Sequence, residues 1–195
     1  RMDSPDLDRV STDREGLKRE IMDRLRAGSR ERVTPVMIER ELARIEREAA
    51  ARDGIRAVEK AGGKAVYHPC DVTDPQQVEA IVKDILERHG RLDLIVHAAG
   101  LERSRGLDTK EPAEFNLVFD VKVMGMFNLL AATRNVDVGA IVSFSSVAGR
   151  FGNAGQTDYS SANDFLCKVT SAMTWLRPKT RGIVIDWTAS VSSTH

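Results

Sequence analysis

Apolar and polar positions along residues 63–195 follow two alternating patterns: short apolar runs, and longer segments with helical spacing. The short runs are typical of buried strands and cover residues 64–70, 92–100, 139–146 and 181–189. The longer segments predict helices over residues 75–90, 111–135 and 157–176. Thr73 or Asp74 is suited to cap the first of these helices, and Gly90 to end it. Because helices of this length separate the strands, we expect an α/β fold with a doubly wound parallel sheet and helices on both faces, in three layers.

Residues 12–62 are different, because they are rich in charge and in helix formers. A polar cap and a glycine stop predict one helix from Thr12 or Asp13 to Gly28, and a longer one from Pro35 to Gly62. The apolar residues of the longer helix recur as one stripe, at Ile38, Leu42, Ile45 and Ala49. Arginine and glutamate alternate on its other faces, which indicates a solvated, ion-paired surface and not a nucleic-acid patch.

Composition narrows the possible partners. Lysine plus arginine and aspartate plus glutamate both number 29, so no net charge favours nucleic acid or an acidic membrane. No apolar stretch approaches the length of a bilayer span, and the first residues do not resemble a signal peptide. The two cysteines, Cys70 and Cys167, are far apart, and both are interpreted as structural thiols in a reducing cytoplasm.

Four polar residues near the end of the chain have the types that carbonyl reduction needs. Hydride transfer to a ketone leaves an alkoxide, which needs a proton. A tyrosine hydroxyl can supply that proton, and a serine hydroxyl can hold the carbonyl oxygen. A nearby ammonium favours the tyrosinate that remains. The candidates are Tyr159, Ser146, Lys122 and Asn163. Tyr159 and Asn163 are four residues apart and would share one helix face, while Ser146 would close a strand. Each residue alone is more often an ordinary surface, strand-end or helix residue, but the four together favour a site.

The run "GNAGQTDYSSAN" around these residues resembles the active-site segment of ketoreductase (KR) domains of polyketide synthases, in the short-chain dehydrogenase/reductase superfamily. Classical members of that superfamily have lysine four residues after the tyrosine and asparagine on the earlier helix. Here the two residue types have exchanged places, with Asn163 after the tyrosine and Lys122 on the earlier helix. This arrangement is typical of the synthase ketoreductases. The resemblance implies a Rossmann-like fold, NADPH as cofactor and no metal, with Tyr159, Ser146, Lys122 and Asn163 as the catalytic residues.

Further residues lie where strands of a parallel sheet would end, at the edge that binds ligands in such folds. They are Asp71, Val72, His97, Ala98, Ala99, Gly100 and Ser145. The resemblance places all of them against the cofactor, together with Lys122 and Tyr159, and pairs Arg1 with the 2′-phosphate of NADPH. For Asp71, capping of the following helix is about as good an interpretation as adenine contact. His97 is expected to pack and form part of the cofactor wall, because Tyr159 already serves as the acid.

No glycine-rich GxGxxG loop occurs in the sequence, although the family has one before the segment that corresponds to Arg1. We therefore expect this chain to be part of a larger polypeptide, without the N-terminal strands of the sheet. In the doubly wound order those strands separate residues 64–70 from residues 92–98, so these two should not be hydrogen-bonded to each other. Residues 1–62 are interpreted as a helical insertion after the second strand, and residues 63–195 as the core of the NADP-binding domain.

The helical insertion is longer than in ordinary modular ketoreductases and resembles that of ketoreductase domains in polyunsaturated fatty acid synthases. The expected reaction is reduction of 3-ketoacyl thioesters, carried on the phosphopantetheine arm of an acyl carrier protein, with neighbouring synthase domains as partners. Phe151 replaces the tryptophan that marks stereochemistry in modular ketoreductases, so the hydroxyl configuration is not predicted. Two alternatives stay open: a catalytically silent structural domain of a synthase, and a free-standing reductase of small carbonyl compounds.

Overall fold

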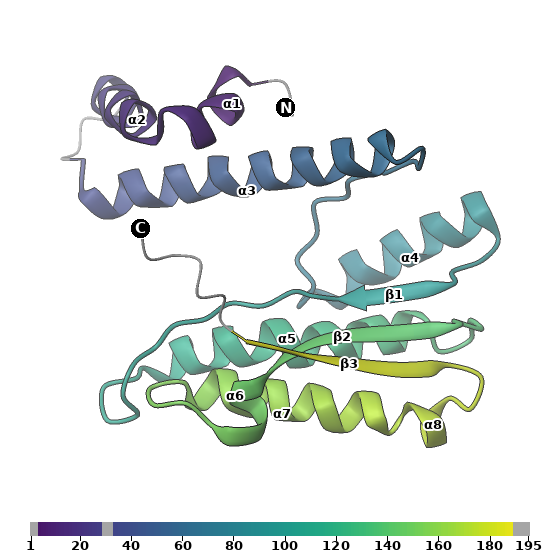
Figure 1. Cartoon of the computed structure of the whole chain (residues 1–195). Helices are drawn as coiled ribbons and strands as arrows, with labels where there is room; N and C mark the ends of the chain where they lie inside the picture. Colours follow the sequence, from purple (N-terminus) through teal and green to yellow (C-terminus); the bar gives the residue numbers. More distant parts are fainter. Residues whose placement is uncertain (1–3, 29–32, 189–195) are drawn as a thin grey trace. The chain divides into compact units, whose positions relative to one another are not determined.

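The computed structural model describes residues 4–28 and 33–188 (Figure 1). The chain divides into two compact units, Arg1–His68 and Pro69–His195. The first unit consists of helices, and the second of a parallel sheet with helices. That the helical unit is an insertion within the domain stays a prediction.

Three helices form the first unit: α1 (Pro5–Thr12), α2 (Arg14–Gly28) and α3 (Pro35–Lys60). The two predicted helices are confirmed as α2 and α3. Thr34 caps α3 by accepting from the Met37 N–H, and Gly62 follows its end with φ +84°, a conformation that favours glycine. Helix α1 was not predicted, although Ser4 caps it and a proline opens it.

The predicted apolar stripe of α3 forms the core of this unit. All four of its residues are buried, and Leu42 is completely so. Residues from α1 and α2 complete the cluster, which consists of Leu7, Leu17, Ile21, Ile38, Leu42, Ile45 and Ala49. Burial of these side chains stabilises the three-helix arrangement, because short helices alone are marginal in water.

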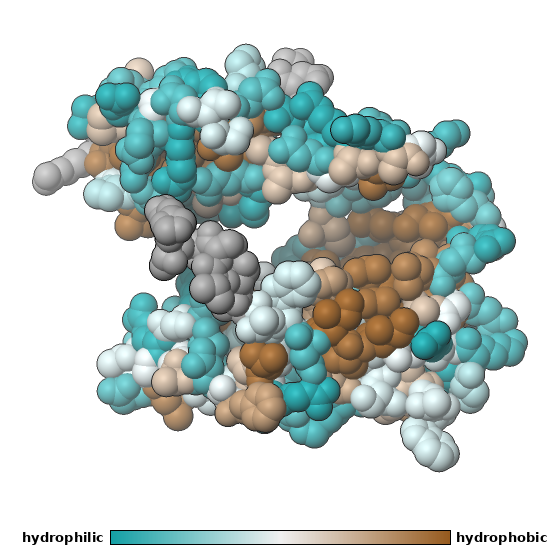
Figure 2. All heavy atoms as spheres, in the orientation of Figure 1, coloured by the Kyte–Doolittle hydropathy of each residue, from teal (hydrophilic) through white to brown (hydrophobic). Residues whose placement is uncertain are grey.

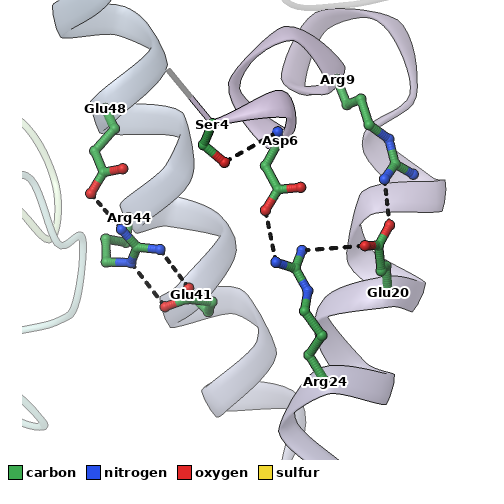
Figure 3. Close-up of polar contacts among 8 residues, drawn as sticks. All are labelled: Ser4, Asp6, Arg9, Glu20, Arg24, Glu41, Arg44 and Glu48. Atoms are coloured by element: carbon green, nitrogen blue, oxygen red, sulfur yellow. Dashed lines mark hydrogen bonds and ion pairs between the residues drawn. The ribbon is translucent and has the colours of Figure 1, made fainter. Parts of the chain in front are cut away.

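Ion pairs join side chains within and between the three helices, and Figure 3 shows some of them. Arg44 lies between Glu41, at 2.7 Å, and Glu48, one helical turn away in each direction. Arg24 reaches from α2 to Asp6 of α1, at 2.8 Å. The interpretation of this surface as solvated and ion-paired is confirmed. Such exposed pairs contribute little to stability individually.

The second unit contains a three-stranded parallel sheet of order β1-β2-β3. Its strands are β1 (Leu94–His97), β2 (Ala140–Ser146) and β3 (Arg181–Trp187). Its helices are α4 (Pro75–His89), α5 (Pro112–Ala132), α6 (Val147–Phe151), α7 (Thr157–Ser171) and α8 (Met173–Leu176). Asp74 caps α4 by accepting from the Gln76 N–H, and Gly90 ends it with φ +71°, both as predicted.

Helices α5 and α7 lie side by side against one face of the sheet (Figure 1). The core between them consists of Ile95, Met126, Val138, Ile141, Leu166 and Met173. Helix α5 corrects one expectation, because its 21 residues are long and apolar enough to cross a membrane by length and composition. It carries the buried polar residues Lys122 and Asn128 and packs against α7, α4 and β1.

The opposite face of the sheet is apolar and open within this unit. Leu94 is 50% and Val96 52% exposed, and both alternate along β1 with buried residues that face α5. Figure 2 shows apolar residues gathered over this region. Within the described part of this unit, the helices that contact the sheet therefore cover one face, where the sequence predicted cover on both.

Residues 64–70 do not form the predicted strand. That they make no ladder with residues 92–98 in the complete domain stays a prediction. A β-branched and aromatic composition favours extended backbone, but a strand needs a partner for its N–H and C=O groups. Without that partner Val66 and Tyr67 are 70% and 52% exposed.

Candidate active site

The carboxyl ends of β1, β2 and β3 meet at one edge of the sheet, beside the start of α7. Two pockets lie at this edge, of about 480 Å³ and 280 Å³. Tyr159, the third residue of α7, lines both of them, together with Glu102 and Trp187. Ser146 belongs to the larger pocket, and Lys122 to the smaller one. Three of the four candidate catalytic residues thus border the pockets.

Lys122 projects from α5 under Tyr159. Its ammonium lies 5.6 Å from the centre of the Tyr159 ring and donates to the carbonyl of Phe144 at 3.0 Å. The residue is only 4% exposed, and burial lowers the pKa of its amine from 10.5 to about 8. The amine is therefore still mostly charged near neutral pH.

Gly100, directly after β1, makes room for this lysine. A Cβ added to Gly100 would lie 2.9 Å from Lys122 Cε and 3.1 Å from its Nζ. Even the smallest side chain would displace the end of Lys122 at this position. The glycine of the "HAAG" run thus has a packing reason in the structure.

Ser146 ends β2 and caps the short helix α6. Its hydroxyl oxygen accepts from the Ala148 N–H at 3.2 Å, which leaves its own proton to be donated. The residue is 8% exposed, on the wall of the larger pocket. It can therefore hold an acceptor oxygen of a ligand in that pocket.

Asn163 lies one turn after Tyr159 and is completely buried. Its amide donates to the Tyr159 carbonyl at 2.7 Å, while its side-chain oxygen has no hydrogen-bond partner. Helix α6 packs tightly here, since a Cβ on Gly149 would lie 2.9 Å from the Asn163 Cβ. Asn163 thus shares a helix face with Tyr159, as predicted, and places an unpaired acceptor beside it.

His97 ends β1 and packs against α5. Its Nε2 lies 2.8 Å from the Lys122 carbonyl oxygen, and because a carbonyl only accepts, Nε2 carries the proton. Burial lowers the pKa of the imidazole, which favours its neutral form. Gly125 leaves room for the ring, since a Cβ there would lie 3.0 Å from His97 Cε1. His97 thus packs in the interior, and its place in the cofactor wall stays a prediction.

Asp71 shapes the turn before α4 and is not its cap. Its carboxylate accepts from the backbone N–H and the hydroxyl of Thr73, at 2.9 and 2.7 Å, and Asp74 caps the helix. Val72 is tied to α5, because its carbonyl accepts from Asn128 at 2.9 Å. Arg1 lies outside the described residues. Adenine contact by Asp71 and Val72 stays a prediction.

The other predicted cofactor residues are divided between the pockets and the interior. Ala98, Gly100 and Ser145 line the smaller pocket, and Ala99 is not among its lining residues. Ser145 also donates to the Asn163 carbonyl at 3.0 Å, which ties β2 to α7. Glu102 and Trp187 line both pockets and were not among the predicted site residues. The position of Trp187 at the end of β3 is the signal that points to this edge.

Comparison with known proteins identifies the family. The KR domain family matches residues 16–191. The chain belongs to this family. A polyunsaturated fatty acid synthase polypeptide of Thraustochytrium sp. (strain ATCC 26185 / S-3) is 38% identical over 144 residues, 73% of this chain and 5% of that protein. Short-chain reductase protein NovJ of Streptomyces niveus is 38% identical over 130 residues, 65% of this chain and 49% of that protein.

Solved structures agree on the fold. An N-terminal ketoreductase from the macrolactin assembly line superposes with a TM-score of 0.66 at 29% identity, covering 73% of this chain and 29% of that one. Gluconate 5-dehydrogenase from Burkholderia cenocepacia J2315, in complex with NADP and tartrate, has a TM-score of 0.62 at 25% identity, covering 71% and 56%. The resemblance to ketoreductases and the Rossmann-like α/β fold with a parallel sheet are confirmed. The roles of individual site residues stay predictions.

Proposed function

We propose that the chain supplies the catalytic part of an NADPH-dependent ketoreductase, which reduces 3-ketoacyl thioesters to 3-hydroxyacyl thioesters. One observation carries the proposal: Tyr159 lines both pockets, and the buried Lys122 ammonium lies 5.6 Å from its ring centre. With the cofactor in one pocket and the substrate in the other, a tyrosine that borders both can give its proton as the hydride is transferred. The synthase relatives support the same reaction class.

The smaller pocket fits the nicotinamide end of the cofactor. Its walls contain the small residues Ala98, Gly100 and Ser145, and larger side chains that include Lys122 and Tyr159 complete the lining. A side chain at Gly100 would press on Lys122, which agrees with a position kept small beside a bound group. NADPH bound here would supply the hydride to the carbonyl carbon of the substrate. Asp71, Val72 and His97 would contribute to holding the rest of the cofactor.

The protein's own residues would handle the oxygen and its proton. The hydroxyl groups of Ser146 and Tyr159 would hold the carbonyl oxygen, and Tyr159 would give its proton to the developing alkoxide. The ammonium of Lys122 would stabilise the resulting tyrosinate, which then regains a proton from solvent. Asn163 would orient a bridging water or Lys122, using the oxygen that has no partner in the protein.

The larger pocket would take the acyl chain. Phe151 and Trp187 offer exposed apolar surface at its rim, 85% and 60% exposed, and Glu102 and Gln156 add polar groups. An open pocket with an apolar rim suits a substrate that enters on a flexible tether. We therefore propose a phosphopantetheine arm of an acyl carrier protein as its carrier, with neighbouring synthase domains as partners. The free thiols of Cys70 and Cys167 agree with a reducing cytoplasm.

The test is Tyr159→Phe in the full-length protein, assayed with NADPH and a 3-ketoacyl thioester on the carrier protein. We expect kcat to fall by roughly two to four powers of ten, with unchanged NADPH affinity, because the substitution removes only the hydroxyl group that donates the proton. Tyr67→Phe is the matched control, since Tyr67 is half exposed and far along the chain from the site. A Tyr159→Phe variant that works at the wild-type rate would overturn the proposed function, in which Tyr159 gives the proton.

A further inference from the structure

Lys110 and Asp158 form a buried ion pair beside the proposed active site. The Lys110 ammonium lies 2.6 Å from the Asp158 carboxylate, and their side chains are only 1% and 0% exposed. By contrast, the Lys179–Asp137 pair at the surface has side chains that are 78% and 79% exposed. Removal of two charges from water is costly, so a pair this deep needs a reason beyond stability.

The pair connects two segments that are 48 residues apart in sequence. Lys110 also donates to the Arg103 carbonyl at 2.8 Å, in the segment that follows β1. Asp158 accepts at 2.9 Å from the backbone N–H of Tyr159. One chain of hydrogen bonds thus runs from the segment at residues 102–110 to the backbone of Tyr159.

Other contacts fasten the same two segments together. The Arg105 N–H donates to the Gly155 carbonyl at 2.8 Å, and Gln156 donates to the Glu102 carboxylate at 3.0 Å. Gly155 has φ +74°, and a Cβ there would lie 3.3 Å from the Arg105 nitrogen, so the approach is close. Glu102 and Gln156 both line the larger pocket. The buried pair therefore lies behind one wall of the proposed substrate site.

The start of α7 depends on this arrangement. Its N-cap residue, Gln156, makes no side-chain cap bond, so the first N–H groups of the helix lack the usual acceptor. Asp158, in the first turn, supplies an acceptor to Tyr159 itself, and its negative charge suits a helix N-terminus. Without it, the turn that carries Tyr159 would be free to fray.

We propose that Lys110 and Asp158 are a positioning pair that fixes the Tyr159 side chain between the two pockets. The proposal rests on the proposed function, in which Tyr159 gives the proton. Neither residue touches the reacting atoms, because Lys110 acts on Asp158 and Asp158 acts on the backbone of Tyr159. Since displacements near 1 Å are enough to slow such chemistry by about 100-fold, the pair should control kcat more than binding.

Two variants of the full-length protein test this. Lys110→Met/Asp158→Leu replaces the pair by apolar groups of similar size, a change that buried pairs often tolerate in stability. Asp158→Glu keeps both charges and moves the carboxylate by one methylene, so no charge is left unpaired. For each we would measure the melting temperature, the Kd of NADPH, and kcat and KM for the ketoacyl substrate. Lys179→Met/Asp137→Leu is the control at the exposed pair.

We expect kcat to fall by about 10- to 100-fold in both variants, with the Kd of NADPH within about twofold of wild type. The control should match the wild type. If either variant folds and keeps the wild-type kcat, the positioning role is wrong. If the double variant does not fold, Asp158→Glu decides alone. A Tyr159→Phe variant with wild-type activity would instead overturn the proposed function, so the two failures are distinguishable.

Discussion

The carbonyl oxygen of Lys122 lies 2.8 Å from Nε2 of His97, while the ammonium of the same lysine donates to Phe144 on the neighbouring strand. Both ends of Lys122 are therefore fixed, its backbone by β1 and its side chain by β2. This explains how a long, flexible side chain reaches a defined place beneath Tyr159. Lysine has four side-chain rotations to restrict, and the two hydrogen bonds with burial restrict them.

Gly100→Ala should disturb the site without unfolding the protein. The added Cβ meets only the end of Lys122, at 2.9 Å from Cε, so the ammonium is expected to move and the backbone to stay. We expect kcat to fall by roughly tenfold, because the misplaced charge no longer stabilises the tyrosinate. Gly54→Ala is the control, since a Cβ there meets nothing within 4 Å. A wild-type kcat for Gly100→Ala would contradict this, because it would show that the Lys122 ammonium keeps its position beside the added methyl group.

Lys122→Met should change how stability depends on pH. The wild-type amine titrates at about 8 when folded and near 10.5 when unfolded, so between these values the unfolded chain binds more protons. The contribution of Lys122 to the free energy of unfolding of the wild type therefore rises with pH across this window. Relative to the wild type, the variant should lose about 1.4 kcal/mol of unfolding free energy per pH unit there.

Denaturant unfolding of both proteins at several pH values measures this difference. Lys83→Met is the control, because the Lys83 side chain is 74% exposed and should show no such slope. A stability difference that is the same at pH 7 and pH 10 would contradict a depressed pKa for Lys122.

Asn163→Leu should separate stability from activity. The substitution removes a buried oxygen without a partner, and the Tyr159 carbonyl keeps its bond within the helix ladder. We expect the melting temperature to stay level or rise, and kcat to fall. Asn128→Leu is the matched comparison, because it leaves the Val72 carbonyl without its 2.9 Å donor and should lower the melting temperature. Equal losses of stability in both variants would contradict this.

Leu42→Ala should weaken the helical unit and spare the chemistry. Leu42 is completely buried in its core, and such truncations cost about 2–5 kcal/mol. Hydrogen exchange should therefore speed up in α3, while kcat per folded molecule stays near the wild type. Val36→Ala, at a 76% exposed residue, is the control. A loss of kcat as large as that of Tyr159→Phe would place the helical unit in the catalytic machinery.

The sequence was most informative where local rules act. Local signals behave as predicted at Asp74, at Gly90 and in the stripe from Ile38 to Ala49, because caps and helical periodicity need only neighbouring residues. Tyr159 and Asn163 share a helix face for the same reason. That Lys122 lies close to Tyr159 was predictable only from the resemblance to the family. Helical periodicity says nothing about contacts between residues so far apart in sequence.

What the sequence did not predict depends on distant partners. Nothing local marks Lys110 as buried, since its salt bridge is made with a residue 48 positions away. Residues 64–70 have a composition typical of a strand, yet strand formation needs a neighbour to pair with. Helix α1 is a different case, because its signal, Ser4 before a proline, was present and was overlooked.

The edge of the sheet at β1 has a consequence for handling the protein. In the part of the chain that the structure describes, β1 pairs with β2 alone, and its outer row of amides and carbonyls runs beside the exposed Leu94 and Val96. An unpaired strand edge beside exposed apolar side chains is a template for strand addition by another chain. Molecules with this edge uncovered should self-associate as concentration and temperature rise, and light scattering would follow that association directly. Solubility thus becomes a simple readout of whether a further strand occupies β1.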